Sequence, residues 1–354
     1  MKRKLRIAQI APLWVRIPPK KYGGIELIIK YLCDELTDRG HHVTLFASGD
    51  SHTKAKLVSL RKRPLLDDGV KWTNQAFTLL NIAQVYERQG EFDIIHTHND
   101  IYDLFFATGA KTASVHTMHN PLIAKGVNEP RKKVFEHYKY LNYVNISESQ
   151  KKLAAVPQMH FVKTVYNGID VAQFSFNAHP KDHFIWIARV DKYKGIGNAV
   201  KAAKLAKVKL LMAGRLDYTQ EKYFANEIKP HLNSQIRFIG EIGGTQKSEF
   251  YREAKALLYP IEWDEPFGLV MVEAMACGTP VIAFNHGSVR EIVKNGITGF
   301  VVNTIPEMIR AMKKIDSIDR RTCRKWVEEK FSVKAMVDGY EEVYERVLAS
   351  KKRR

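Results

Sequence analysis

The sequence predicts an α/β protein made of two doubly wound domains, each with a parallel sheet covered by helices on both faces. Three observations predict this fold class. Short β-branched segments alternate with amphipathic stretches along the chain, as in repeated βα units. Most strand segments are continuous apolar runs, which is typical of parallel strands that are buried on both faces. The length of 354 residues fits two domains of about 150 residues each.

The first set of strands lies in the N-terminal half. We expect strands at 5–12, 42–47, 93–97, 113–117, 143–147 and 161–165. After the first strand, apolar residues from Ile25 to Leu36 recur at helical spacing, and Gly40 is placed to cap a helix at its C-terminus. These features predict a helix over 25–39.

The pattern breaks near 170–183 and then starts again. The second set of strands is expected at 184–188, 209–213, 236–239, 256–259, 281–284 and 300–302. Asp217 is a candidate N-cap for a helix through Leu232, and Thr245 for another through Lys255. We therefore place an N-terminal domain at 1–168 and a C-terminal domain at 169–332. The apolar stripe near the end of the chain predicts a helix over about 333–350, which we expect to pack back on the N-terminal domain.

Composition limits the function classes. No apolar run reaches the roughly 18 residues that a membrane-spanning helix needs. The three cysteines, Cys33, Cys277 and Cys323, are odd in number and far apart, which argues against a disulfide framework or a zinc site and suits a reducing compartment. We expect a cytoplasmic protein, without a metal or a cofactor.

The formal net charge is +18, with basic runs such as 131–133 and 351–354. A solvated basic surface explains this excess, and peripheral contact with an anionic membrane face or an acidic acceptor is the alternative. No nucleic-acid-binding signature accompanies the charge, so we expect no nucleic acid partner.

Two glycines, Gly23 and Gly24, follow the first strand and open the first helix. Glycines there allow a ligand to approach the backbone, and a helix N-terminus favours an anion. The spacing lacks the G-x-G-x-x-G pattern of a dinucleotide-binding loop, which argues against a dehydrogenase.

Arg189 and Lys194 follow the first strand of the second set. Ligands of open α/β sheets bind beyond the carboxyl ends of the strands, so these two cations are placed to hold a phosphate group. Solvated surface cations are the competing interpretation of this motif taken alone.

The segment 263–281 carries two acids eight residues apart, Glu265 and Glu273. Pro266 and Gly268 mark a turn, and helix-forming residues follow, so the backbone N–H groups of 268–270 lie at a helix N-terminus. Glu273 is one helical turn after Leu269, on the same face. Glu265 could reach sugar hydroxyls and Glu273 ribose hydroxyls, whereas ordinary surface acids are the competing interpretation.

Together these motifs resemble glycosyltransferase family 4, a retaining family with the GT-B fold. Glu265 and Glu273 match its E-x7-E signature, Arg189 and Lys194 its phosphate-binding pair, and 23–26 its glycine loop. Further matches run in family order from about residue 5 to 345 and include the segments 117–119, 147–149, 167–170 and 278–281. Within the family, 45–50 and 263–273 resemble the subgroup of avilamycin-type and pterin glucosyltransferases. One departure is Asp191-Lys-Tyr in place of the common Pro-Glu before the lysine.

The resemblance implies two Rossmann-like domains facing across a cleft, with the nucleotide on the C-terminal domain and the acceptor on the N-terminal one. The implied catalytic residues are Glu265, Arg189, Lys194 and His119. The implied donor-binding residues are Gly23, Gly24, Ile239, Phe267, Gly268, Leu269, Val270 and Glu273. No metal ligand is implied, because Arg and Lys neutralise the diphosphate.

The expected function is therefore retaining transfer of a sugar from a nucleotide diphosphate-sugar to an unidentified hydroxyl acceptor. UDP-glucose is preferred as donor, with GDP-mannose as the alternative. A catalytically silent sugar-nucleotide-binding protein, an epimerase or a phosphorylase on the same fold remain as alternatives.

Overall fold

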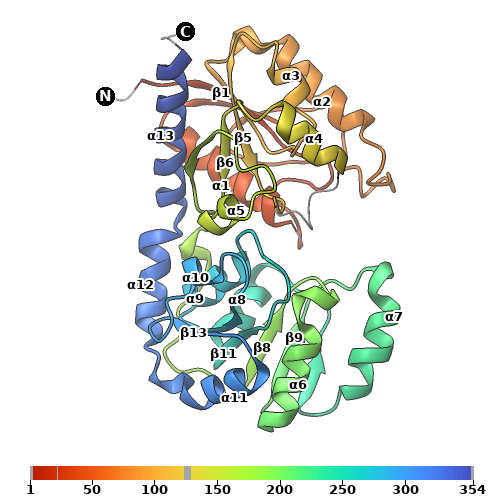
Figure 1. Ribbon diagram of the computed structural model, residues 1–354, viewed down its shortest axis with the longest axis vertical. Helices are drawn as coiled ribbons and strands as arrows, with labels where there is room; N and C mark the ends of the chain where they lie inside the picture. The colour runs from red at the N-terminus through yellow and green to blue at the C-terminus, as the bar shows by residue number, and fades with distance from the viewer. Residues whose placement is uncertain (1–2, 22, 123–128, 352–354) are drawn as a thin grey trace. The chain divides into compact units, whose positions relative to one another are not determined.

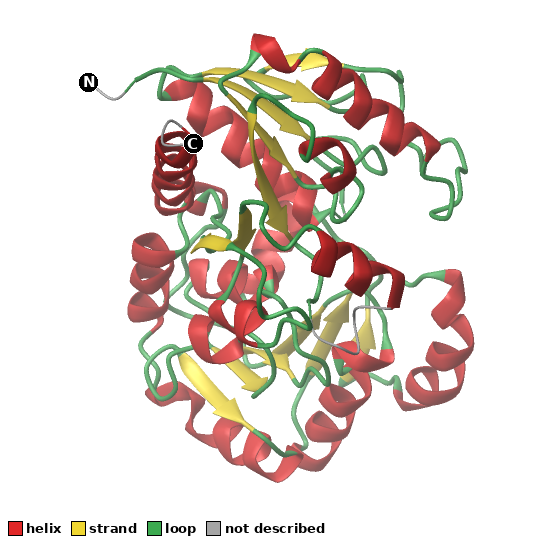
Figure 2. Cartoon of the chain, turned by 45° about the horizontal axis from the view of Figure 1, so that its top comes forward, coloured by secondary structure: helices red, strands yellow, loops and turns green. Residues whose placement is uncertain are grey.

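The computed structural model describes residues 3–21, 23–122 and 129–351. The chain divides into two compact units (Figure 1). The N-terminal unit comprises Met1–Gly168 and Val333–Arg354, and the C-terminal unit comprises Ile169–Ser332. Each unit has a parallel sheet with helices around it (Figure 2), which confirms the predicted α/β class.

The N-terminal unit has a seven-stranded sheet, all of whose strand pairs are parallel. In sheet order the strands are β3 (Lys56–Val58), β2 (His42–Phe46), β1 (Arg6–Ile10), β4 (Ile94–Thr97), β5 (Ala113–Met118), β6 (Tyr143–Asn145) and β7 (Phe161–Thr164). Its helices are α1 (Gly24–Asp38), α2 (Ala76–Glu87), η1 (Gln89–Glu91), α3 (Leu104–Ala107), α4 (Glu129–His137), α5 (Glu148–Lys152) and α13 (Val333–Lys351). The central strand β1 buries Ile7 to Ile10 and pairs with β2 and β4, as its unbroken apolar run predicts.

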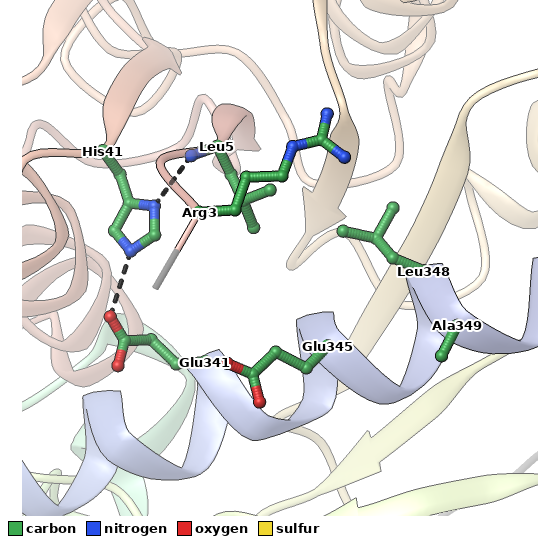
Figure 3. A pocket seen from close by; sticks show the side chains of 7 residues that line it. All are labelled: Arg3, Leu5, His41, Glu341, Glu345, Leu348 and Ala349. Atoms are coloured by element: carbon green, nitrogen blue, oxygen red, sulfur yellow. Dashed lines mark hydrogen bonds and ion pairs between the residues drawn. The ribbon is translucent and has the colours of Figure 1, made fainter. Parts of the chain in front are cut away.

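Helix α13 is part of the N-terminal unit although it ends the sequence. Its Tyr340 and Tyr344 are fully buried. His41 joins the helix to Leu5, the residue before β1 (Figure 3): the Leu5 N–H donates to His41 Nδ1 at 3.1 Å, and His41 Nε2 lies 3.0 Å from Glu341 Oε1. Because Nδ1 accepts, Nε2 carries the proton and donates to the carboxylate.

The C-terminal unit has a six-stranded parallel sheet. In sheet order the strands are β10 (Ile236–Phe238), β9 (Leu210–Ala213), β8 (Phe184–Ile187), β11 (Ala256–Tyr259), β12 (Val281–Phe284) and β13 (Gly299–Val302). Its α-helices are α6 (Ile196–Ala206), α7 (Glu221–Tyr223), α8 (Gly244–Arg252), α9 (Leu269–Ala276), α10 (Val289–Ile292), α11 (Ile305–Lys314) and α12 (Arg320–Lys330). Its short 3-10 and π segments are η3 (Val171–Gln173), η4 (Lys192–Lys194), η5 (Tyr218–Gln220), η6 (Phe224–Ile228), η7 (Lys229–His231) and η8 (Ile315–Ser317).

Two elements differ from the expectation, and a third is less regular than expected. No strand was expected at β3, because three residues at a sheet edge give too short a pattern to detect. The helix expected from Asp217 through Leu232 is present over 218–231, with Asp217 at its N-cap and Leu232 at its C-cap, but it consists of consecutive 3-10, α and π turns. The Asp217 carboxylate lies 2.7 Å from Arg215 Nε and makes no capping hydrogen bond. Helix α8 begins at Gly244, so Thr245 lies inside it rather than at the cap.

The three cysteines are free and buried. Among the described residues, no helix combines the length and the apolar character that a membrane span requires.

Candidate functional site

The C-terminal sheet reverses its strand order between β8 and β11. From β8 the chain builds outward through β9 and β10, then returns to the other side of β8 with β11. Such a switch point opens a crevice beyond the carboxyl ends of the two strands. The segment that carries Arg189 and Lys194 follows β8, and the segment that carries Glu265 follows β11. The topology therefore brings the two predicted motifs to the same edge.

Lys194 and Glu265 meet there. Lys194 Nζ lies 2.5 Å from Glu265 Oε2, and both side chains are largely buried. Tyr259 Oη and Trp263 Nε1 donate to the same oxygen at 3.0 and 2.9 Å. The lysine ammonium also lies 4.4 Å from the Trp263 ring centroid, within the range of a cation–π contact. Burial and the adjacent Glu265 charge raise the pKa of Tyr259, so its hydroxyl stays protonated and remains a donor.

The backbone that carries Lys194 is held at both ends. Asp191 caps η4 by accepting a hydrogen bond from the Tyr193 N–H at 2.9 Å, so this departure from the common Pro-Glu still ends in an ordered turn. Trp186 Nε1 donates to the Lys194 carbonyl at 3.0 Å. Gly195 has φ +77°, and a Cβ there would lie 1.9 Å from the Pro260 carbonyl oxygen, so only glycine fits.

Glu265 is held by the segment that follows β12. The Ser288 N–H donates to the Glu265 carbonyl at 3.0 Å, and Ser288 Oγ donates to the Phe267 carbonyl at 2.6 Å. Gly287 has φ +55°, and a Cβ on it would lie 2.3 Å from that Glu265 carbonyl oxygen. The loop that carries Glu265 is thus packed directly on a glycine backbone.

Helix α9 begins directly after this loop. Gly268 is its N-cap, in the left-handed conformation, and Leu269 and Val270 are partly exposed in its first turn. The first amides of a helix have no intrahelical acceptor and carry partial positive charge. The predicted helix N-terminus at 268–270 therefore lies next to Glu265 in the sequence and follows the switch-point strand β11.

Glu273 is buried on α9, with 2% of its surface exposed. Lys247 Nζ lies 2.7 Å from its carboxylate, and Tyr251 Oη donates to Oε2 at 2.8 Å; both partners are on α8. Burial and Glu273 raise the pKa of Tyr251, which keeps its hydroxyl protonated. A ribose that binds Glu273 would have to share the carboxylate with these two donors.

Three further residues were predicted for the site in the C-terminal unit: Arg189, Ile239 and Phe267. Arg189 is 43% exposed at its side chain and lies 3.5 Å from Asp191 Oδ2. Ile239 follows β10 and is 39% exposed, so a flat ring could pack on it. The Phe267 side chain is buried against Phe331 with ring centroids 5.9 Å apart, so a ligand could reach Phe267 only at its backbone.

The N-terminal sheet has its own switch point, between β1 and β4. Gly23 and Gly24 stand at the start of α1, in the connection that follows β1. Gly23 has φ +149°, and a Cβ on it would lie 2.7 Å from Pro19 Cβ and 2.9 Å from Glu26 Oε2. Glu26 is buried, and the loss of solvent raises its pKa to about 7.

His119 ends a buried network in the same unit. His119 Nε2 lies 2.9 Å from His98 Nδ1, and His98 Nε2 lies 3.1 Å from Gln9 Oε1. Gln9 Nε2 donates to Tyr344 Oη at 3.2 Å, and His96 Nδ1 lies 2.8 Å from the same hydroxyl. The network therefore joins β1, β4 and β5 to α13.

Hydrogen-bond directions in the network fix the tautomers. The Gln9 oxygen can only accept, so His98 Nε2 carries a proton and the neutral His98 accepts at Nδ1. His119 Nε2 must then donate, which leaves its Nδ1 as an acceptor, and no described residue donates a hydrogen bond to that atom. Burial lowers the pKa of His119 to about 4, so the ring is neutral near pH 7. The pKa values of His96 and His98 are also well below their ordinary value, because of burial and the neighbouring histidines.

His96 and His98 could suggest a metal site. Within the described residues, no group of three or more His, Cys, Asp or Glu side chains is arranged to hold a metal ion. The two rings serve the hydrogen-bond network instead.

Sequence reasoning missed the residues that hold the acids. Lys247 and Tyr251 are four residues apart on α8, and this spacing was the available signal for a shared partner. Tyr259 and Gln9 gave no signal, because a polar residue within an apolar strand does not reveal its partner. The spacing of Tyr138, Tyr140 and Tyr143 near basic residues suggests a group that stacks on sugars or faces a membrane, but Tyr143 is fully buried and belongs to the core.

Comparison with known proteins identifies the class. The model of "Glycosyltransferase Family 4" matches residues 22–173, and that of "Glycosyl transferases group 1" matches residues 170–331. A phosphatidyl-myo-inositol mannosyltransferase of Mycolicibacterium smegmatis is 26% identical over 321 residues, which is 84% of this chain and 81% of the relative.

Solved structures agree with this class. AviGT4, a glycosyltransferase involved in avilamycin A biosynthesis, superposes with a TM-score of 0.73 at 21% identity and covers 98% of both chains. Anabaena HepE in complex with UDP and glucose gives a TM-score of 0.76 at 16% identity, over 97% of this chain and 100% of that one. Fold and family models together define the protein as a glycosyltransferase with the GT-B fold. The chain belongs to glycosyltransferase family 4.

Proposed function

We propose that this glycosyltransferase is a retaining, metal-independent enzyme that takes its sugar from a nucleotide diphosphate-sugar held by the C-terminal unit. The observation that carries the proposal is the Lys194–Glu265 pair at the switch point between β8 and β11, next to the N-terminus of α9. This arrangement offers a mobile cation, helix amides and a fixed carboxylate within one short stretch of the sheet edge.

Each group has a proposed task. Lys194 and Arg189 neutralise the diphosphate, and the amides of 268–270 add partial positive charge where the leaving group gains negative charge. Glu265 accepts hydrogen bonds from the donor sugar, and its three present donors orient its carboxylate. Glu273 accepts from the ribose, and Ile239 lies against the base.

The N-terminal unit is proposed to bind the acceptor. Gly23 and Gly24 would allow a phosphate oxygen to approach the start of α1. His119 is neutral, and its Nδ1 is an acceptor that no described residue occupies, so it suits a hydrogen bond from a sugar hydroxyl rather than an ion pair with phosphate. In the proposed front-face reaction, an oxygen of the departing diphosphate helps deprotonate the incoming hydroxyl.

UDP-glucose is the preferred donor, and GDP-mannose is the alternative. The complex of HepE with UDP and glucose supports the first, and the mannosyltransferase relative supports the second. Because the same relative is a phosphatidyl-myo-inositol mannosyltransferase, a lipid acceptor is the first to test. With such an acceptor, the basic surface of the chain would contact an anionic membrane.

The test is a thermal-shift panel of UDP-glucose, GDP-mannose and the two free diphosphates, because a ligand that binds the folded state raises its stability. One nucleotide family should stabilise the wild-type protein, and donor hydrolysis should fall in Glu265→Gln. Binding without any hydrolysis or transfer would instead indicate a silent sugar-nucleotide-binding protein. A product of inverted anomeric configuration in NMR would contradict retention.

A further inference from the structure

A second pocket lies on the C-terminal unit, outside the predicted donor site. It has a volume of about 630 Å³, which is within the range of small-molecule sites. One wall is the face of α6 that carries Asn198, Lys201 and Leu205, spaced three and four residues apart. The opposite wall comes from the segment with Tyr223, Glu227 and His231.

The lining combines three kinds of chemistry. Lys192, Lys201 and Lys204 supply cations, and Lys204 Nζ lies 3.2 Å from His231 Nδ1. No described residue forms an ion pair or hydrogen bond with the ammonium of Lys192 or Lys201.

Carboxylates and apolar groups complete the lining. Glu227 and Glu262 can accept hydrogen bonds from hydroxyl groups, and Glu262 already accepts one from Asn198 Nδ2. Leu205 is 61% exposed and, with the Tyr223 ring, offers an apolar surface. Carboxylates, cations and an apolar face together suit a sugar ring with an anionic substituent, because the hydroxyls, the anion and the ring face each find a partner.

The backbone of the pocket is also unusual. The wall that carries Glu227 is the π segment η6, and π-helical turns are frequent at functional sites. On α6, Gly197 faces Tyr223: a Cβ at Gly197 would lie 3.2 Å from the tyrosine hydroxyl. The missing side chain leaves room for the tyrosine to line the pocket.

The pocket is joined to the predicted donor site through two short segments. Lys192 lines the pocket, and Lys194, two residues later, contacts Glu265. Glu262 also lines the pocket, and its N–H donates to the Tyr193 carbonyl at 2.8 Å. The two sites thus share backbone but use different side chains.

We propose that this pocket binds an acidic saccharide, either a sugar phosphate or a uronic acid, separately from the donor site. The shared chemistry is a pyranose ring with one anionic group. The proposed binding follows from the lining of this pocket and not from which nucleotide-sugar is the donor. Binding of the acidic saccharide can therefore be measured without catalysis.

The test is calorimetric titration of the full chain with glucose 6-phosphate and with glucuronate, with glucose and inorganic phosphate as comparison probes. We expect at least one acidic sugar to bind more tightly than glucose and than phosphate. Binding of glucose 6-phosphate but not of glucuronate would identify a site for a sugar phosphate, and the reverse would identify a site for a uronic acid. Absence of binding by both, or equal binding of glucose or of phosphate, would overturn the proposal.

Matched variants locate the binding. Lys201→Glu should raise the Kd for the acidic sugar roughly tenfold or more, because it replaces an attractive charge with a repulsive one. Lys222→Glu changes an exposed lysine of α7 that does not line the pocket, and should leave binding unchanged. Lys194→Ala should also leave it unchanged. Loss of binding in Lys194→Ala together with full binding in Lys201→Glu would assign the sugar to the donor site and refute the second site.

Discussion

Removal of the Lys194 ammonium is the sharpest perturbation of the proposed donor site. In Lys194→Ala, Glu265 loses the ion partner at 2.5 Å but keeps the donors Tyr259 and Trp263. Stripping one partner from a fully buried ion pair costs about 3–5 kcal/mol. The two side chains here are 16% and 14% exposed and the carboxylate keeps two donors, so we expect a loss of about 1–2 kcal/mol in unfolding free energy.

The loss in catalysis should be larger than the loss in stability. A charge-assisted hydrogen bond to the diphosphate contributes about 1.5–3 kcal/mol, which corresponds to roughly a 10- to 150-fold fall in kcat/KM. The assay is initial-rate transfer or donor hydrolysis at several donor concentrations, with thermal unfolding of the same preparations to show that the variant is folded.

Two further variants isolate the charge. Lys194→Arg keeps a cation with a different geometry and should retain more activity than Lys194→Ala. Lys222→Ala removes an exposed lysine from the same unit and should match the wild type. If Lys194→Ala retained kcat/KM within about threefold of the wild type while folded, the role of the ammonium in donor binding would be refuted.

Three other predictions follow from the packing and the charges. Gly287→Ala should lower the free energy of unfolding by about 2 kcal/mol or more and reduce activity, because its Cβ would displace the Glu265 backbone. Gly296→Ala is also at positive φ but has nothing within 4 Å, so it should cost only about 1 kcal/mol. Urea unfolding measures both losses, and equal losses would contradict this prediction. The folded-state pKa of Glu26 lies above its ordinary 4.5, so its neutral form stabilises the fold below about pH 4.5 and this contribution disappears as the pH rises through 7. Glu26→Gln should therefore gain up to about 3 kcal/mol relative to wild type between pH 4 and pH 8, while the exposed Glu87→Gln should show no such trend. Incubation with a chelator should leave transfer unchanged, and activity lost to the chelator and restored by Mg²⁺ or Mn²⁺ would overturn the proposed metal independence.

Much of the fold could be predicted because parallel strands are buried on both faces. Strands such as β8 and β11 appear in the sequence as short apolar runs at the expected positions, and the glycine at 268 marked the start of α9. Edge and irregular elements were harder to predict. Strand β3 is too short to show a period, and the helix expected from Asp217 through Leu232 changes between 3-10, α and π turns, which no sequence pattern marks.

The candidate site was predictable in its residues but not in its contacts. Lys194 and Glu265 lie 71 positions apart, and their pairing depends on the adjacency of β8 and β11, which no local pattern records. The same is true of His119, whose tautomer depends on Gln9 of β1 and on His98, which follows β4. A sequence motif therefore identifies the candidate site residues, whereas the residues that contact them are set by the order of the strands in the sheet.

The position of α13 has a consequence for biosynthesis. As the ribosome delivers the chain, residues 169–332 are released as a continuous segment that has all of its own strands and helices. The unit that was synthesised first must wait for the last residues, because Tyr340 and Tyr344 fill its interior and hydrogen-bond to Thr117 and Gln9. The C-terminal unit therefore has all of its residues available for folding before the N-terminal unit does. Early termination near position 332 would leave the N-terminal unit without its two core tyrosines.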